Sequence, residues 1–292
     1  MKNKIAVGTA NFGMTYGIGV ESHRVAENEV ARLIEYCVNQ KLAMFDTAPG
    51  YGESEQVLGR ICLGGSYIVT KMVKLERNEV SDDCIARLEN GLQNSLRKLR
   101  VSSVYGLLVH SVADLYKPGA ERIVSWMSGL KERGLVNKIG VSVYTQEEVD
   151  DLYNKKCIFD LIQLPLNIFD QRLLISGTLD WLREKGVEIH ARSLFMKGLL
   201  LKEEFPPINA PLLHDHHQRF ISYLSNLSVD AFDVCMAFAK SLDVVDRWVL
   251  GFSQVEQLRR VIQWDDDVSG EKICFEDWAL TSSTSVDPRC WR

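Results

Sequence analysis

Eight short β-rich runs alternate along this chain with longer segments of helical apolar periodicity. The runs lie at residues 5–9, 42–46, 67–71, 104–110, 138–142, 160–164, 187–192 and 247–251. Between them, apolar residues recur every three or four positions, as they do from Leu88 through Leu92 and Leu96 to Leu99. This alternation is typical of parallel strands joined by right-handed crossovers. Eight such units in 292 residues predict an α/β protein with a closed (β/α)8 TIM barrel, as a single domain over residues 1–292.

The rival fold is an open, doubly wound sheet. That fold usually places a GxGxxG turn after its first strand, and GTANFG (8–13) does not have this spacing. In the predicted barrel, a long segment at 193–246 separates the seventh and eighth strands. A C-terminal tail from about 265 to 292 belongs to no βα unit. Two capping boxes, Thr145-x-x-Glu148 and Ser253-x-x-Glu256, are predicted to open the helices that follow the fifth and eighth strands.

Composition excludes several classes of protein. The net charge of −5 is not typical of proteins that bind nucleic acids, whose surfaces are positively charged. No apolar run approaches the roughly 20 residues that span a bilayer. The first residues, MKNKIAVGTANFG, carry no signal-peptide pattern, and the seven cysteines form no CxxC pair. We therefore expect a cytoplasmic protein with a small-molecule substrate and neither nucleic-acid nor membrane partners. The oligomeric state is left open.

The ends of the predicted strands carry polar side chains. In chain order these ends are Gly8-Thr9, Asp46, Lys71, His110, Ser142, Gln163, Arg192-Ser193 and Gly251-Phe252-Ser253. The chemistry of a (β/α)8 barrel occupies the carboxyl ends of its strands. A single Asp, Lys or His at such a place is usually a turn former, a solvated rim charge or a structural side chain. Three of them on consecutive strands, followed by Tyr51 in the loop after Asp46, are better explained by a shared site.

These four side chains make chemical sense together. A phenol has an ordinary pKa of about 10, which is too high for an effective proton donor at neutral pH. The Lys71 ammonium would lower the pKa of Tyr51, and Asp46 would hold Lys71 charged and oriented. His110 could donate a hydrogen bond to a substrate carbonyl oxygen. The set predicts hydride reduction of an aldehyde or ketone, with Tyr51 as the general acid.

The block FDTAPGYGESEQVLG (45–59), followed by TK (70–71) and LLVHS (107–111), resembles the aldo-keto reductase superfamily. The likeness runs from GTANFG (8–13) through GVS (140–142) and ARSLF (191–195) to GFSQVEQL (251–258). It implies a (β/α)8 barrel, a nicotinamide cofactor and a catalytic tetrad of Asp46, Tyr51, Lys71 and His110.

The resemblance also implies a cofactor track. Ser142 and Gln163 would hold the nicotinamide carboxamide, and Arg192 would stack on the nicotinamide ring. Segment 197–200 would pass over the pyrophosphate. The predicted cofactor-binding residues are Gly8, Thr9, Asp46, Ser142, Gln163, Arg192, Ser193, Gly198, Leu199, Gly251, Ser253 and Gln257. NADP(H) is the family default, and NAD(H) is possible.

Two departures from the family pattern bear on the cofactor. Val143 replaces the amide-bearing residue of the family's GVSN block. The loop 251–258 has no Lys or Arg to grip an adenosine 2′-phosphate, and Gln257 stands where an Arg is common. Arg259 or Arg260 could fold back over the adenosine instead. We therefore expect weak discrimination between NADPH and NADH.

Two other functions compete with carbonyl reduction. One is a Schiff-base lyase with Lys71 as nucleophile, although Asp46 would raise the pKa of that lysine instead of lowering it. The other is a barrel that binds cofactor as a regulatory or scaffold subunit without turnover. The histidines of LLHDHHQRF (212–220) match no standard metal-ligand spacing, so no metal is expected. We interpret this segment as a solvated lid or as the start of a helix. The segment GTANFGMTYGI (8–18) resembles reductases of bacterial surface-sugar biosynthesis, which suggests a sugar-derived carbonyl.

Overall fold

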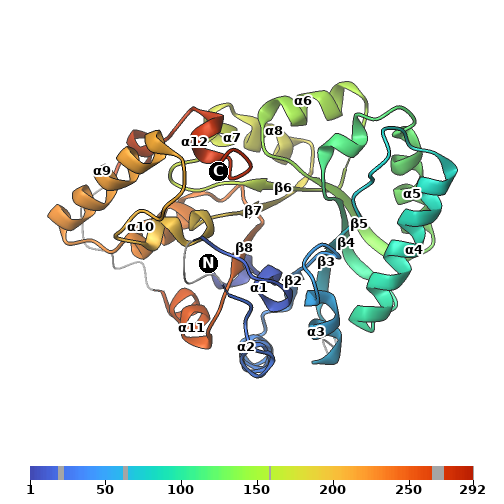
Figure 1. Cartoon of the computed structure of the whole chain (residues 1–292), viewed down its shortest axis with the longest axis horizontal. Coiled ribbons are helices and arrows are strands. Elements are labelled where there is room, and N and C mark those ends of the chain that lie inside the picture. The colour runs from blue at the N-terminus through green and yellow to red at the C-terminus, as the bar shows by residue number, and fades with distance from the viewer. Residues whose placement is uncertain (19–22, 62–64, 158, 265–272, 292) are drawn as a thin grey trace.

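Eight parallel strands close into one barrel in which each strand pairs with the next and β8 pairs with β1 (Figure 1). The structure, a computed structural model, describes residues 1–18, 23–61, 65–157, 159–264 and 273–291. The strands are β1 (Ile5–Gly8), β2 (Met44–Asp46), β3 (Tyr67–Lys71), β4 (Val104–Val109), β5 (Val136–Ser142), β6 (Leu161–Pro165), β7 (Glu188–Arg192) and β8 (Arg247–Gly251). The predicted (β/α)8 barrel is confirmed.

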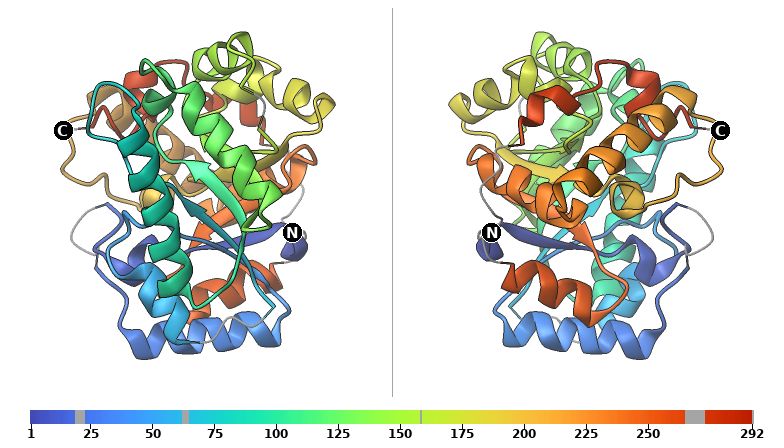
Figure 2. Two further views of the ribbon diagram at one scale, coloured as in Figure 1. Left: turned by 90° about the vertical axis from the view of Figure 1, so that its right-hand side faces the viewer. Right: turned by 90° about the vertical axis from the view of Figure 1, so that its left-hand side faces the viewer.

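Helices surround the barrel (Figures 1 and 2), and the longer ones carry buried apolar residues at helical spacing. They are α1 (Ala10–Gly13), α2 (Glu27–Asn39), α3 (Ser54–Arg60), α4 (Asp82–Leu99), α5 (Glu121–Glu132), α6 (Gln146–Asn154), α7 (Arg172–Ile175), α8 (Thr178–Glu184), α9 (Pro211–Leu227), α10 (Ala231–Ser241), α11 (Val255–Gln263) and α12 (Ser283–Val286). Short 3₁₀ turns are η1 (Lys2–Lys4), η2 (Val112–Leu115), η3 (Met196–Leu201) and η4 (Phe275–Trp278). In α4 the predicted stripe is buried as expected. No helix among the described residues is both long and apolar enough to cross a membrane.

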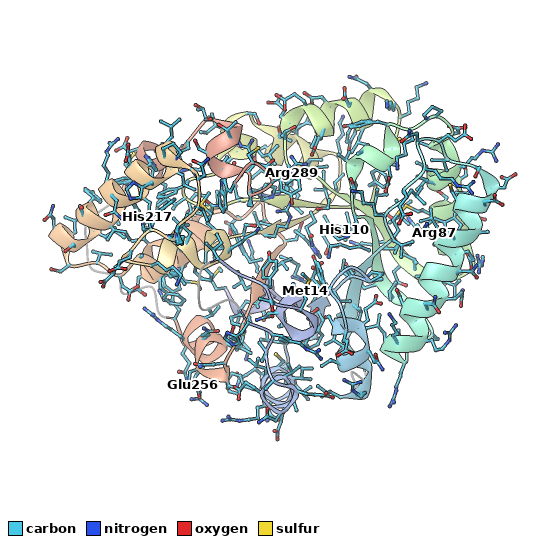
Figure 3. The ribbon with its side chains drawn as sticks, viewed as in Figure 1. Met14, Arg87, His110, His217, Glu256 and Arg289 are labelled. Atoms are coloured by element: carbon cyan, nitrogen blue, oxygen red, sulfur yellow. The ribbon has the colours of Figure 1, made fainter. Side chains whose placement is uncertain are left out.

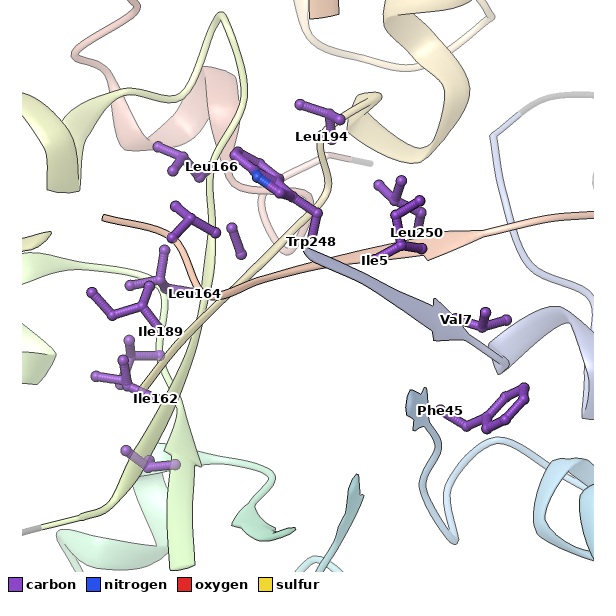
Figure 4. Close-up of a cluster of buried hydrophobic side chains, with 14 of the residues drawn as sticks. Ile5, Val7, Phe45, Ile162, Leu164, Leu166, Ile189, Leu194, Trp248 and Leu250 are labelled. Carbon is purple, nitrogen blue, oxygen red and sulfur yellow. The ribbon is translucent and has the colours of Figure 1, made fainter. Parts of the chain in front are cut away.

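Alternation along the strands divides the core into two layers. Outward-facing residues pack under the helices, as Figure 4 shows for Val7, Phe45, Ile189 and Trp248. Inward-facing residues form a smaller apolar cluster inside the barrel, made of Ala6, Met44, Val69, Leu108 and Leu161. The same inward parity places polar side chains at the carboxyl ends of the strands, above this cluster.

The long segment between β7 and β8 carries η3, α9 and α10. The tail after α11 returns across the carboxyl face, where α12 lies beside α9 (Figure 1). The Leu280 amide donates to the Phe169 carbonyl at 2.8 Å, and the His216 ring pairs with the Trp278 carbonyl at 3.0 Å. Part of the expected tail, residues 265–272 and Arg292, lies outside the described residues.

The end of the barrel opposite the polar rim holds a second polar group. Glu188 accepts from Tyr105 at 2.6 Å, from the Lys138 ammonium, and pairs with the His190 ring at 2.7 Å. Burial alone would raise the pKa of Glu188, but the hydrogen bonds from its three partners bring it down to about 2. Glu188, Tyr105, Lys138 and His190 are called the floor network below.

The lowered pKa of Glu188 predicts an acid-sensitive fold. Its stabilising contribution is present above the ordinary value of 4.5 and is lost as the pH falls through about 2. At neutral pH, Glu188→Gln is expected to lower the free energy of unfolding by on the order of 3 kcal/mol. Urea unfolding of both proteins across acid pH should show this difference shrinking toward pH 2. Glu184→Gln, an exposed control, should show no such trend; a difference that stays constant with pH would contradict the assignment.

Candidate active site

Two charged side chains at the carboxyl ends of β2 and β3 form a buried ion pair. The Lys71 ammonium donates to Asp46 Oδ1 at 2.7 Å and to the Thr47 carbonyl at 2.9 Å, and both side chains are almost wholly buried. Burial alone would lower the pKa of Lys71, but the Asp46 carboxylate and the nearby Tyr51 phenol raise it on balance. Lys71 therefore remains an ammonium ion inside the barrel.

Tyr51 lies in the loop between β2 and α3, and close backbone packing holds that loop. A Cβ on Gly13 would meet the Tyr51 carbonyl oxygen at 2.0 Å, so only glycine lets α1 approach the loop this closely. Gly52 has a φ of +60° and packs against the Gly13 carbonyl from the other side. The Ser54 hydroxyl bonds to the Thr9 hydroxyl at 2.7 Å and so ties the loop to β1. The loop is fixed on both sides.

The phenol ring of Tyr51 lies between Lys71 and His110. The Lys71 Nζ atom is 5.0 Å from the centroid of this ring. The His110 ring meets it edge to face, with 6.0 Å between centroids. Burial and the Lys71 charge lower the pKa of His110 to about 4, so the imidazole is neutral at physiological pH and keeps one N–H to donate. The structure thus brings together all four side chains that the sequence assigned to the tetrad.

Gln163 makes a contact that sequence analysis did not predict. Its Nε2 donates to Asp46 Oδ2 at 2.8 Å, so each carboxylate oxygen of Asp46 has a buried donor. Ser142, expected beside Gln163, is its register partner on β5 but is buried at the strand end and does not line the cavity described next.

A cavity of about 430 Å³ opens beside Tyr51 and runs along the ends of β7, β8 and β1. Of the predicted cofactor-binding residues, Gly8, Thr9, Asp46, Gln163, Arg192, Ser193, Gly198, Gly251, Ser253 and Gln257 line it. Leu199, a residue of η3, does not, because its side chain is fully buried in the hydrophobic core. Among the described residues that line it, Asp46 is the single carboxylate, and three are basic: Arg192, Lys197 and Arg260.

Arg192 and a residue of the C-terminal tail, Arg289, contact the same aromatic ring, that of Tyr144. The Arg192 guanidinium carbon is 4.1 Å from the Tyr144 ring centroid, and that of Arg289 in the tail is 3.7 Å from it. Both guanidinium groups therefore stack within cation–π distance of the same ring. Asp287 holds Arg289 with contacts of 2.6–3.0 Å.

The last helix begins differently from the prediction. Ser253 was expected to open a capping box with Glu256, but the N-cap is Gln254, and its partner is Gln257. The Gln257 side-chain oxygen accepts from the Ser253 amide at 2.7 Å and from the Gln254 amide at 3.3 Å. The expectation was wrong by one residue, because the Gln254 side chain, one position later, accepts from the Gln257 amide and so caps the helix in place of Ser253. The other predicted box holds in its first half, since the Thr145 hydroxyl accepts from the Glu148 amide.

Three residues at the far end of the cavity were not predicted as a group. The rings of Phe195 and Phe232 stack with 5.8 Å between centroids, and the Arg260 guanidinium carbon is 3.9 Å from the Phe232 centroid. Arg260 also pairs with Asp230 at 2.9 Å. Sequence analysis proposed Arg260 only as a cation that could fold back over the adenosine of the coenzyme. Phe195 and Phe232 gave no local signal, because the long β7–β8 segment brings them together.

The histidines of segment 212–220 belong to helix α9, which begins at Pro211. His216 and His217 are buried, and the His217 ring pairs with the Leu199 carbonyl at 3.1 Å (Figure 3). Both are core side chains near the beginning of this helix, so of the two predicted alternatives the helix start is confirmed and the solvated lid is wrong for both. Across the part of the chain that the structure describes, no cluster of three or more His, Cys, Asp or Glu residues could hold a metal ion.

Comparisons with known proteins agree with this geometry. No curated protein matches the chain. Among solved structures, the aldo-keto reductase AKR11C1 from Bacillus halodurans, in its holo form, is 18% identical with a TM-score of 0.70, covering 94% of this chain and 89% of its own. The glycerol dehydrogenase AKR11B4 from Gluconobacter oxydans is 20% identical with a TM-score of 0.67, covering 98% and 92%. The model of the Aldo/keto reductase family matches residues 4–265. The chain therefore belongs to the aldo/keto reductase family, whose members are NAD(P)H-dependent oxidoreductases that act on small carbonyl compounds.

Proposed function

We propose that this protein reduces an aldehyde or ketone with NAD(P)H, and that Tyr51 is its general acid. The observation that carries the proposal is the placement of one phenol, at the edge of the cavity, 5.0 Å from a buried ammonium that Asp46 holds. An ammonium at this range stabilises the phenolate and so makes the phenol a better proton donor.

The residues along the cavity fit a dinucleotide. Its three basic residues and single, already paired carboxylate suit a pyrophosphate. The stack of Phe195, Phe232 and Arg260 is a flat surface for a purine. Gln163 and Arg192 would hold the nicotinamide end, beside Tyr51. A bound reduced nicotinamide supplies the hydride that the reaction needs.

The protein's own residues then handle the proton. Tyr51 gives its hydroxyl proton to the carbonyl oxygen as hydride reaches the carbonyl carbon, which yields the alcohol. The neutral His110 donates a hydrogen bond to the same oxygen and stabilises the charge that develops there. Asp46, held by Gln163, keeps Lys71 charged through the cycle. A sugar or sugar-derived carbonyl is the substrate suggested by the sequence of segment 8–18.

Lys71 is poorly placed for the alternative Schiff-base chemistry. Its side chain is 1% exposed, and its ammonium is engaged by Asp46 and Thr47, so a substrate carbonyl has no path to the nitrogen. The raised pKa of Lys71 also opposes the neutral amine that such a nucleophile requires.

One experiment separates the three candidate functions. The protein is mixed with NADPH or NADH and an aldehyde, and loss of the reduced coenzyme is measured against alcohol formed. If the amount of reduced coenzyme lost equals the amount of alcohol formed, the proposal is supported. Coenzyme binding without turnover of any aldehyde would favour a scaffold role, and a borohydride-trapped adduct on Lys71 would establish the lyase.

The coenzyme preference should depend on Asp230. This carboxylate pairs with Arg260 and so weakens the one cation at the proposed adenosine end. Asp230→Asn removes the charge but keeps a good N-cap for α10, where the side chain accepts from the Phe232 amide. We expect the variant to bind NADPH about tenfold more tightly, with NADH little changed, because a freed guanidinium would pair with the 2′-phosphate.

The measurement is the dissociation constant of each coenzyme for both proteins. Arg260→Ala provides the converse variant and should weaken NADPH binding more than NADH binding. If Asp230→Asn tightens both coenzymes equally, then Arg260 does not read the 2′-phosphate.

A further inference from the structure

Glu55 is a buried acid that the proposed reaction does not use. It lies in the first turn of α3, four residues after Tyr51, and is 2% exposed. Its Oε1 accepts from the Thr70 hydroxyl at 2.8 Å, and its Oε2 accepts from the Ser95 hydroxyl at 3.1 Å. Burial raises the pKa of Glu55, because these two bonds and the charges of more distant lysines offset only part of its effect. A carboxylate that is costly to bury thus joins α3 to β3 and to α4.

The bond from Thr70 comes from the strand that carries Lys71. Side chains alternate along a strand, so Thr70 points outward to Glu55 while Lys71, the next residue of β3, points into the barrel. The same turn of α3 is held on its other side by Ser54, whose hydroxyl donates to the Thr9 carbonyl at 2.9 Å, at the end of β1. The start of α3 is therefore tied to both strands that flank β2.

These ties set where the phenol of Tyr51 lies relative to the ammonium of Lys71. The Ser54 amide donates to the Tyr51 carbonyl at 3.1 Å, so the loop that carries the phenol runs directly into α3. Lys71 is held separately, by Asp46 and the Thr47 carbonyl. A shift of α3 would therefore change the 5.0 Å between the Lys71 Nζ and the Tyr51 ring centroid. Reaction rates are sensitive to such changes, because a misplacement of about 1 Å can cost roughly a hundredfold.

We propose that Glu55 is a positioning residue, which holds Tyr51 beside Lys71 through its bond with Thr70. The inference rests on the proposed function, because it concerns the geometry of the proposed proton donor. The bond with Ser95 joins the same carboxylate to α4 and should contribute to stability alone. Glu55 and Thr70 are not among the residues that line the cavity, so their substitution should leave coenzyme binding unchanged.

Two variants that each remove one hydroxyl from this carboxylate provide the central test. Thr70→Val keeps the shape of the side chain and should lower kcat by about ten- to a hundredfold, with little change in the KM of the aldehyde or the Kd of the coenzyme. Ser95→Ala should lower the Tm by a similar amount and leave kcat close to the wild-type value. The kcat is expressed per coenzyme-binding site, counted by titration, so that loss of folded protein does not imitate a slower reaction. An unchanged kcat in Thr70→Val, or equal losses in both variants, would overturn the proposal.

Substitutions of Glu55 itself separate the effect of geometry from that of charge. A Gln at this place can accept from Thr70 through its side-chain oxygen and donate to the Ser95 hydroxyl through its amide, so Glu55→Gln should keep most of the wild-type kcat. Glu55→Ala should lose as much kcat as Thr70→Val, and the double variant should lose little more, because both substitutions break the same link. Equal losses in Glu55→Gln and Glu55→Ala would assign the effect to the negative charge and contradict a positioning role.

A measurement without turnover distinguishes failure of this inference from failure of the proposed reaction. Tyrosines are isotopically labelled at Cζ for NMR, and the resonance of Tyr51 is identified by its loss in Tyr51→Phe. It should move in Thr70→Val and Glu55→Ala and keep its position in Ser95→Ala. If no aldehyde is reduced but the resonance follows this pattern, the proposed reaction fails and the positioning role stands. If aldehydes are reduced but neither kcat nor the resonance responds to Thr70→Val, the reductase stands and the positioning role is removed.

Discussion

Tyr51→Phe is expected to lower the kcat of carbonyl reduction by about 10²–10⁴-fold, because it deletes the proposed proton donor and little else. The ring keeps its edge-to-face contact with His110, and the loop that carries it is held by Gly13, Gly52 and Ser54, none of which touches the hydroxyl. The Kd of the coenzyme should therefore stay close to the wild-type value. Steady-state kinetics and a coenzyme titration measure the two quantities.

Tyr67→Phe is the matched control for this substitution. Tyr67 begins β3 at the opposite end of the barrel and is half exposed, so the same loss of a hydroxyl should leave the rate intact. Wild-type turnover in Tyr51→Phe would show that another group supplies the proton, and a large loss in Tyr67→Phe would show that the assay reports folding instead of chemistry.

Lys71→Met is expected to affect both stability and rate. It leaves Asp46 as a buried carboxylate with Gln163 as its remaining partner, and breaking a buried pair in this way costs about 3–5 kcal/mol of the free energy of unfolding. Without the ammonium, no cation lies beside the phenol to stabilise the negative charge that Tyr51 acquires as it gives up its proton, and the rate should fall by on the order of 10²-fold or more.

The double variant Asp46→Asn with Lys71→Met separates these two effects. Removing both charges leaves no uncompensated ion in the barrel, so much of the lost stability should return. The rate should not return, because no cation then lies beside Tyr51. Denaturant unfolding and kcat are measured for both single variants and the double. Recovery of the rate along with stability would mean that the ion pair serves folding and not the proton donor.

Sequence reasoning placed Asp46, Lys71 and His110 at one rim because the position of each residue along its predicted strand decides which end of the barrel it occupies. Once β2 ends at Asp46 and β3 at Lys71, the closed topology alone brings them to one rim. The contact of Gln163 with Asp46 crosses the barrel from β6 to β2 and depends on side-chain reach, which no local pattern encodes. The same holds for the stack of Phe195 and Phe232, two residues that meet only because the β7–β8 segment folds back.

The start of α11 shows another limit of the sequence. Both Ser253 and Gln254 could cap the helix, and the choice depends on which backbone amides are left unpaired. This choice also bears on the prediction for the coenzyme. Gln257 lines the cavity, but its side-chain oxygen already accepts a hydrogen bond at the start of the helix. The loop expected to select the coenzyme thus uses this side chain to hold its own helix, and Arg260, one of the two cations that the sequence offered as an alternative, lines the cavity beside it.

Strand β7 links the floor network to the chemistry, and this has a consequence for how the protein can evolve. Its inward-facing residues run from Glu188 through His190 to Arg192, with His190 wholly buried between the acid that stabilises the fold and the cation that lines the cavity. His190 is the register partner of Gln163, and its Nδ1 has no hydrogen-bond partner. A substitution there alters the support of Glu188 and the packing beside Gln163 at once. Substitutions at Arg192 that reshape the cavity would thus be easiest to accommodate in proteins that keep His190, because this one residue supports Glu188 and packs beside Gln163 at the same time.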